Sequence, residues 1–375
     1  MSRPIFLHNG HQGACLRIAR GLITAPQAQA GDLQVDLEGA RLLPGLINAH
    51  DHLQLNGLPR LKYREGHYAN AAEWIADITP RLKSEPCLRA YRALPRTQRL
   101  RQGGLKNLLS GVTTVAHHET WEAALGAPTF PVRVPRLGFA HSLGLDGELS
   151  VHASHRSGER PWVIHAGEGI DAAAAAEFER LEALDCITHE TLLVHGLGFG
   201  PDQLQRLIEA GAGLVWCPGS NVHLFGRTLD PQALLRAGRL TLGSDSRISG
   251  EFDLLHELGL ARQLAGLAEA DLEALVSTRA AALLALPDRG SLDVGKLGDV
   301  LVLPAGLPLS EARRSDLRLV LVGGEARYAD EALADACFPE LVPIEVDGVA
   351  KRLWRPLLDA ARTEPGLRVR SEALA

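Results

Sequence analysis

The pattern of apolar and polar positions changes at about residue 44 of this chain. Before that point, residues 15–25 and 33–44 alternate apolar with polar side chains and are broken by Gly, Pro and Gln, which is typical of short strands. After it, short apolar runs alternate with stretches of helical period, which predicts repeated strand–helix units as far as about residue 288. Strand-like segments then return at 291–304 and 317–330.

This order predicts an α/β protein with a parallel barrel over residues 44–288. Residues 1–43 and 289–345 are expected to pair into one small β domain, and residues 346–375 read as a charged, partly helical tail. Seven barrel strands are predicted to end near His52, His118, His141, Glu168, His195, Cys217–Asn221 and Asp245. The fourth strand is unclear, with residues 149–154 as a weak candidate. Helices are predicted at 171–183, 201–210, 252–267 and 272–286.

Polar residues with metal-binding side chains follow several of these apolar runs. His50 and His52 are two residues apart on a predicted strand, so both side chains leave the same face. His165 and Asp245 each follow a separate short apolar run. Because strand ends of a parallel barrel meet at its C-terminal face, these histidines, with His195, are predicted to make a site for a divalent metal, where Asp245 is a ligand or a base. The alternative for the His50–His52 pair alone is two hydrogen-bonded loop histidines.

Two more strand-end residues are candidates for catalysis. Glu168 lies three residues after His165, where a carboxylate can move protons between water, substrate and leaving group. Its alternative role is to cap the helix predicted from residue 171. His195 ends its own apolar run and is expected to polarise a carbonyl, orient water or bind a second metal.

In these motifs the chain resembles the amidohydrolase superfamily, on the branch of metal-dependent deaminases and chlorohydrolases of the cytosine deaminase and triazine hydrolase type. The matching motifs occur in the family's order and cover nearly the whole chain. They are PGLINAHDHL, HAGE, VHG, CPGSN, LGSDS and the exit segment STRAAALLALPDRGSLDVGKLGDVLVL. The resemblance implies a distorted (β/α)8 TIM-type barrel with a composite β-sandwich built from both termini.

The resemblance also implies roles for single residues. His50, His52, His165 and Asp245 become the metal site, while Glu168, His195 and Asp245 become the catalytic residues. Asp245 would also accept a proton from water. Five further side chains near the strand ends are expected to reach the substrate: His117, His118, His141, His223 and Arg247.

The positions of the lysines favour one metal ion over two. Some members of the superfamily bridge two metals with a carboxylated lysine at the barrel centre. This chain has no lysine between Lys106 and Lys296, where such a residue would lie, so we expect no lysine at the metal site. The cofactor is therefore predicted to be one divalent ion, zinc first and iron as the alternative.

These features predict a hydrolase that uses metal-activated water to cleave a non-peptide carbon–nitrogen bond of a small, perhaps cyclic, compound. Deamination is the leading reaction. The first alternative is hydrolysis of a cyclic amide, as in relatives similar to imidazolonepropionase, and the second is a barrel that only binds a ligand.

Composition and charge narrow the possible partners and location of the protein. The net charge of -6 is spread along the chain and no basic patch suggests nucleic acid. No signal-peptide core or membrane-length apolar run is present, and the five cysteines are scattered. We therefore expect a cytoplasmic protein with a small-molecule substrate, without nucleic-acid or membrane partners, and a homo-oligomer is compatible with the sequence.

Overall fold

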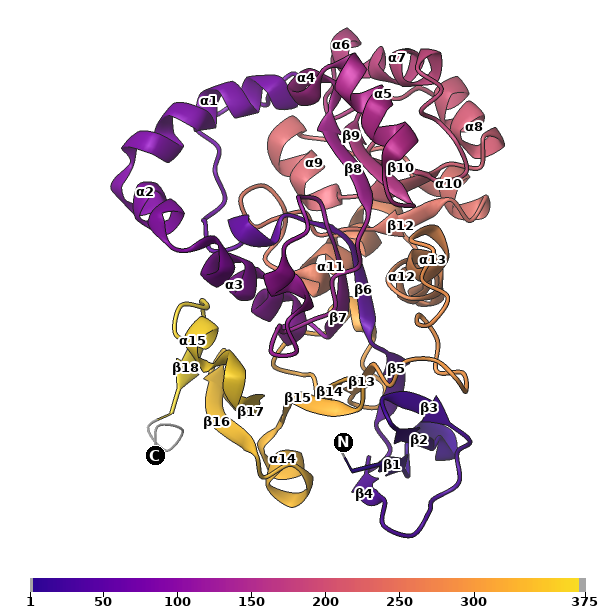
Figure 1. The fold of residues 1–375 in the computed structure, drawn as a ribbon, viewed down its shortest axis with the longest axis vertical. Coiled ribbons are helices and arrows are strands. Elements are labelled where there is room, and N and C mark those ends of the chain that lie inside the picture. The colour runs from indigo at the N-terminus through magenta and orange to yellow at the C-terminus, as the bar shows by residue number, and fades with distance from the viewer. Residues whose placement is uncertain (1–2, 371–375) are drawn as a thin grey trace.

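The computed structural model describes residues 3–370 and has two parts (Figure 1). The larger part is a distorted TIM-type barrel surrounded by helices. The smaller part is rich in antiparallel strands and combines the first and the last segments of the chain. Residues 1–2 and 371–375, at the ends of the predicted small domain and tail, lie outside the described residues.

All seven predicted barrel strands form. Five of them make one parallel sheet in the order β12-β11-β10-β9-β8, and the first two pair with each other in parallel. The barrel closes between its last and first strands, where the Asp245 backbone N–H donates to the His50 carbonyl at 3.1 Å. The strands are β6 (Leu46–Asp51), β7 (Val112–His117), β8 (Gly138–Ser142), β9 (Trp162–Ala166), β10 (Thr191–His195), β11 (Gly213–Trp216) and β12 (Leu240–Leu242).

Two details of the strand predictions are wrong. Residues 149–154, the weak candidate for the fourth strand, lie in helix α5 (Glu148–Ser157). The segment before His141 is also not one continuous strand. Arg133 bridges to Thr114 of β7, whereas β8 begins at Gly138 and pairs with β9. Pro135 lies between the two pieces, and a proline has no N–H for a strand ladder.

Helices follow the barrel strands, as the pattern predicted. The helix predicted at 272–286 is two helices, because the chain leaves helical geometry at Ser277, and the one predicted at 171–183 is also divided. The helices are α1 (Ala71–Ser84), α2 (Pro86–Ala93), α3 (Arg96–Leu109), α4 (Leu143–Asp146), α5, α6 (Ala172–Ala175), α7 (Glu177–Ala183), α8 (Pro201–Glu209), α9 (Pro218–Phe225), α10 (Gln232–Arg236), α11 (Leu254–Ala265), α12 (Glu269–Leu275), α13 (Thr278–Leu283), α14 (Glu331–Cys337) and α15 (Leu358–Ala361).

The β-rich part contains two sheets. The four-stranded sheet has the order β3-β2-β1-β4, and the seven-stranded sheet has the order β18-β16-β17-β15-β14-β13-β5. Antiparallel pairing of β5 with β13 joins the N-terminal segment to the C-terminal one. The strands are β1 (Ile5–His8), β2 (Leu16–Ala19), β3 (Leu22–Thr24), β4 (Leu33–Asp36), β5 (Arg41–Pro44), β13 (Val300–Leu303), β14 (Leu319–Val322), β15 (Glu325–Asp330), β16 (Leu341–Val346), β17 (Val349–Trp354) and β18 (Leu367–Val369).

The segment predicted as a tail from residue 346 is more ordered than expected. It contributes β17 and β18 to the seven-stranded sheet, with only the short helix α15 between them. The domain boundaries near residues 44 and 288 remain a proposal. Among residues 3–370, no helix is long and apolar enough to cross a membrane.

The barrel strands are buried on both faces, which explains their continuous apolar runs. Every residue of β6, β7 and β10 is buried. A small apolar cluster that includes Ile47 and Val194 fills the interior. The polar residues predicted for the site lie where these strands end.

Candidate functional site

Three histidines from two strand ends direct their Nε2 atoms to one point. The Nε2 atom of His165 lies 3.2 Å from that of His50 and 3.3 Å from that of His52. The three ring centroids are 4.9–5.2 Å apart. Two nitrogens bound tetrahedrally to zinc at about 2.05 Å would be about 3.3 Å apart. The spacing therefore fits three imidazoles that share one metal ion.

Asp245 completes the group from the loop after β12. Its Oδ1 lies 3.7 Å from Nε2 of His50 and 3.9 Å from Nε2 of His52. Its Oδ2 accepts a hydrogen bond from the Ser249 hydroxyl at 2.8 Å. The hydroxyl thus holds one carboxylate oxygen while the other faces the histidines.

The tautomer of His165 is fixed by the neighbouring strand. Its Nδ1–H donates to the backbone carbonyl of His141 in β8 at 2.7 Å, which leaves Nε2 as the atom with a free lone pair. Burial lowers the pKa of both His50 and His165 well below the usual value, so these imidazoles are neutral at pH 7. Neutral imidazole is the form that binds metals.

His118 was predicted to reach the substrate, but it lies within this histidine cluster and is buried. Its ring stacks on that of His165, with centroids 4.3 Å apart and planes 16° from parallel. Its Nε2 lies 2.8 Å from the Ala140 carbonyl oxygen, and its buried Nδ1 has no hydrogen-bond partner. His118 therefore belongs with His50, His52 and His165 to one group whose ligand atoms lie within 4.8 Å of one another, so it is a further residue that could hold a metal ion.

Glu168 and His195 lie together beside the histidine cluster. Oε1 of Glu168 is 3.6 Å from Nε2 of His195, whose Nδ1 is 3.0 Å from Oδ1 of Asn221 on α9. The amide oxygen can only accept, so His195 carries its proton on Nδ1 and presents Nε2 to Glu168. Asn221 belongs to the CPGSN motif, and this contact gives the motif a physical role.

Burial shifts both groups toward their neutral forms. Burial, with an added contribution from the charge of Asp245, raises the pKa of Glu168 well above its usual value. Burial lowers the pKa of His195 to about 4. A carboxyl group with a raised pKa beside polar strand ends is the arrangement expected of a proton carrier.

Two residues of the site have backbone angles that non-glycine residues seldom adopt. His195 has φ +74° and Asp245 has φ +50°. Such positions cost about 1–3 kcal/mol each and persist where the surroundings hold them. Both are strand-end residues with side chains directed into the cluster.

The remaining residues predicted to contact substrate lie in different surroundings. His141 is half-buried at the mouth, with Nε2 3.4 Å from Glu119. His117 is buried, and its Nδ1 accepts from the Leu53 backbone N–H at 3.3 Å. No ring contact joins His117 or His223 to the cluster among the residues that the structure describes.

Arg247 is also placed differently from the prediction. Its guanidinium is buried and binds Glu364 through both terminal nitrogens, at 2.6 and 3.0 Å. Its Nε donates to the carbonyl of Phe252. These contacts occupy the nitrogen atoms that would have recognised a substrate.

One lysine lies closer to the site than the sequence indicated. Lys106 does not join the histidine cluster, but its Nζ is 3.1 Å from Oδ2 of Asp51 and 3.3 Å from the carbonyl oxygen of Asp245. Lys106 lies on α3, whereas a lysine at the barrel centre was expected only after it in the chain. The only sequence signal was a single cation in the apolar stretch GGLKNLL.

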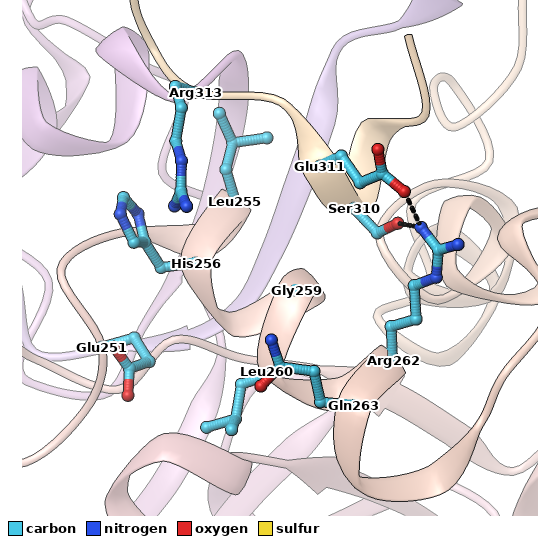
Figure 2. A pocket seen from close by; sticks show the side chains of 10 residues that line it. All are labelled: Glu251, Leu255, His256, Gly259, Leu260, Arg262, Gln263, Ser310, Glu311 and Arg313. Carbon is cyan, nitrogen blue, oxygen red and sulfur yellow. Dashed lines mark hydrogen bonds and ion pairs between the residues drawn. The ribbon is translucent and has the colours of Figure 1, made fainter.

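A separate surface pocket of about 720 Å³ lies along α11 and is shown in Figure 2. No residue predicted for the active site lines it. Its Arg262 binds Glu311 and Ser310, as the dashed lines in Figure 2 show. The pocket is therefore distinct from the histidine cluster.

Comparisons with known proteins agree with the motifs. The amidohydrolase family model matches residues 145–326. A 5-methylthioadenosine/S-adenosylhomocysteine deaminase of Halobacterium salinarum is 26% identical over 347 residues, which cover 78% of this chain and 79% of that protein. An aminodeoxyfutalosine deaminase of Deinococcus radiodurans is 40% identical over a shorter stretch of 86 residues, 22% of this chain and 21% of that protein.

Solved structures share the fold. An adenosine deaminase from Xanthomonas campestris with bound zinc superposes with a TM-score of 0.69 at 18% identity, covering 86% of this chain and 92% of the other. An atrazine chlorohydrolase from Arthrobacter aurescens in complex with zinc also gives a TM-score of 0.69, at 17% identity, over 86% of this chain and 94% of the other. The predicted barrel with its β-rich domain is confirmed.

Proposed function

Because the chain belongs to the amidohydrolase superfamily, on its deaminase and chlorohydrolase branch, we propose that it deaminates a small aminated heterocycle with one zinc ion. Its broader class, a metal-dependent hydrolase of non-peptide carbon–nitrogen bonds, follows from the family. The finer proposal rests on the Nε2 atom of His165, which lies 3.2 Å from that of His50 and 3.3 Å from that of His52, and on Oδ1 of Asp245, which lies 3.7–3.9 Å from the same two Nε2 atoms of His50 and His52.

The proposed metal ligands are His50, His52, His165 and Asp245. Imidazole nitrogens with one carboxylate oxygen form a donor set that suits zinc, and the neutral histidines have their lone pairs free. The ion supplies Lewis-acid activation of water at neutral pH. Nζ of Lys106 is bound to Asp51, to Ser244 and to the Asp245 carbonyl, so it is not free to bridge two ions, which supports a single ion.

Glu168 is the proposed proton carrier. Its side chain is 15% exposed beside His195, and because its pKa is raised, its carboxylate can take a proton from water and the resulting acid can deliver that proton to the departing nitrogen. His195 presents Nε2 on the same side and orients the reacting groups. Asp245, through Oδ1, is placed to accept a further proton.

The relatives suggest the class of substrate. The similar protein of Halobacterium salinarum is named as a deaminase of 5-methylthioadenosine and S-adenosylhomocysteine, and that of Deinococcus radiodurans as an aminodeoxyfutalosine deaminase. We extend that class to this chain and propose a 6-aminopurine nucleoside or a related aminated ring. The half-buried pair of His141 and Glu119 lies at the mouth, where it can contact polar groups of the substrate.

An ammonia-release screen tests this function. Metal-loaded protein is incubated with aminopurine nucleosides, aminated pyrimidines and cyclic amides, and ammonia is measured. Ammonia released from an aminated ring supports deamination. Ring opening of a cyclic amide without ammonia would favour the imidazolonepropionase-like alternative, and no turnover of any compound would favour the ligand-binding barrel.

Metal analysis tests the ligands separately. The variant that combines His50→Ala with His52→Ala removes two of the three converging nitrogens, so we expect it to lose the ion that wild-type protein holds at one per chain. Elemental analysis of both purified proteins measures this. Metal at the wild-type level in the variant would contradict the ligand assignment.

A further inference from the structure

A buried ion pair lies directly behind the proposed metal ligands. Asp51 stands between His50 and His52, and because side chains alternate along a strand it points away from the histidines. There its Oδ2 lies 3.1 Å from Nζ of Lys106 on α3, and the side chains of both residues are 0% exposed. Burying two opposite charges is costly unless further polar contacts satisfy them.

Those further contacts are present around Asp51. Its Oδ1 accepts from the Asn56 amide at 2.8 Å, and its Oδ2 also accepts from the Asn107 amide at 2.8 Å. Asn48 connects the same group, since its amide nitrogen lies 2.8 Å from Oδ1 of Asn107. The carboxylate is therefore fixed on both oxygens, behind the strand that carries the two histidines.

Lys106 extends this network to the other side of the site. Its Nζ donates to the Ser244 hydroxyl at 3.0 Å and to the Asp245 carbonyl at 3.3 Å. The Ser244 hydroxyl also donates to the Asp245 carbonyl, at 2.8 Å. Asp245 is the residue with φ +50°, so its carbonyl is held in an unfavourable backbone geometry by a cation and a hydroxyl.

The three contacts of Lys106 thus connect three elements. They join α3 to the end of β6, which presents His50 and His52, and to the loop after β12, which presents Asp245. The same two strand ends are joined by the hydrogen bond from the Asp245 N–H to the His50 carbonyl. No other element among residues 3–370 places a lysine against either strand end.

We propose that Lys106, paired with Asp51, is a positioning residue that sets the separation and orientation of the histidine pair and Asp245 for metal binding. It touches neither substrate nor ion; it acts through the backbone of Asp245 and through the strand that carries the histidines. This inference rests on the metal centre proposed above. Loss of contacts that orient metal ligands typically lowers metal affinity by roughly 10- to 100-fold.

The test compares metal affinity in three proteins by competition with a chelator. The first is wild type. The second combines Lys106→Met with Asp51→Asn, so that no unpaired charge remains in the buried space. The third is Lys351→Met, a matched control in which another buried lysine, bound to the Leu317 carbonyl and to Asp330, is removed far from the site.

We expect the double variant to bind zinc roughly 10- to 100-fold more weakly than wild type. The control should lose thermal stability but keep its metal affinity within about twofold. The absorption spectrum of bound Co²⁺ should change in the double variant alone, because it reports ligand geometry. Ser244→Ala, which removes one hydroxyl, should weaken binding in the same direction and serves if the double variant does not fold.

Wild-type affinity in both the double variant and Ser244→Ala would overturn the inference. So would an equal loss of affinity in Lys351→Met, because the effect would then be one of general stability. These results differ from failure of the proposed function. If wild-type protein binds no metal, the metal centre is wrong, whereas tight metal binding without ammonia release leaves the role of Lys106 intact.

Discussion

At the scale of single residues, function depends on which side chain binds the ion and which moves protons. Three histidines and Asp245 already converge, so a further anionic ligand is not required. Glu168 lies beside His195 instead, with a pKa raised by burial. This separation between a ligand set and a proton carrier underlies the proposed mechanism.

Replacing Glu168 by Gln tests that separation. The amide keeps the shape of the carboxyl group but cannot transfer a proton, so turnover should fall by roughly 10²- to 10⁴-fold. Metal content, by elemental analysis, and melting temperature should stay at the wild-type values. Near-normal turnover with a lowered melting point would instead make Glu168 a structural residue.

Some residues of this site could be predicted from the sequence and others could not, for a physical reason. His50, His52, His165 and Asp245 were found because each follows an apolar run, and such runs end at one face of a barrel. Lys106 was missed because its partner Asp245 is 139 residues away and its helix carries no local sign of that contact.

At the scale of elements, local sequence also failed to predict the structure of residues 149–154. Leu149 and Val151 would share a face of a strand, which suggested β structure. In the helix that forms, Val151 and His155 share the buried side, while Leu149 is 89% exposed. Two apolar residues were too few to distinguish the two-residue repeat of a strand from the 3.6-residue repeat of a helix.

Another element-scale contact links α11 to the start of α9. The carboxylate of Glu257 on α11 accepts from the backbone N–H groups of Gly219 and Glu251, each at 2.9 Å. Burial raises the pKa of Glu257 to about 8 from an ordinary 4.5. Between pH 4.5 and about pH 8, Glu257 is protonated in the folded protein but ionised in the unfolded chain. The free energy of unfolding therefore falls as pH rises through this range.

Glu257→Gln removes this titration. The stability of the variant relative to wild type should therefore improve as pH rises from 5 to 8, by up to about 1.4 kcal/mol per pH unit, and level off above about pH 8. Urea unfolding of both proteins across this range measures the difference. Stability curves that run parallel at every pH would show that Glu257 is ionised in the folded protein.

At the scale of the whole molecule, the C-terminal segment is bound to the barrel near the candidate site. Oε1 of Glu364 accepts from Arg247 at 2.6 Å and from Arg314 at 2.7 Å, and Arg314 also binds Asp347. Arg247 follows Asp245 by two residues. The last part of the chain therefore fixes the loop that carries a proposed metal ligand, which a local sequence pattern cannot predict.

Breaking this buried network should destabilise the protein. Glu364→Gln leaves two buried guanidinium groups without their shared anion, so we expect a loss of about 3–5 kcal/mol in the free energy of unfolding. Glu311→Gln is the control, because its pair with Arg262 is exposed and should contribute less than about 1 kcal/mol. Equal, small losses in urea unfolding would show that the network does not hold the segment.

The central claim is that one metal ion at the histidine cluster supports deamination, and a metal titration tests it most directly. Protein stripped of metal is given zinc in steps while ammonia release from an aminopurine nucleoside is followed. We predict no release without metal, a linear rise with added zinc, and saturation at one ion per chain. Full ammonia release by the stripped protein, or a rise that continues to two ions per chain, would contradict the account.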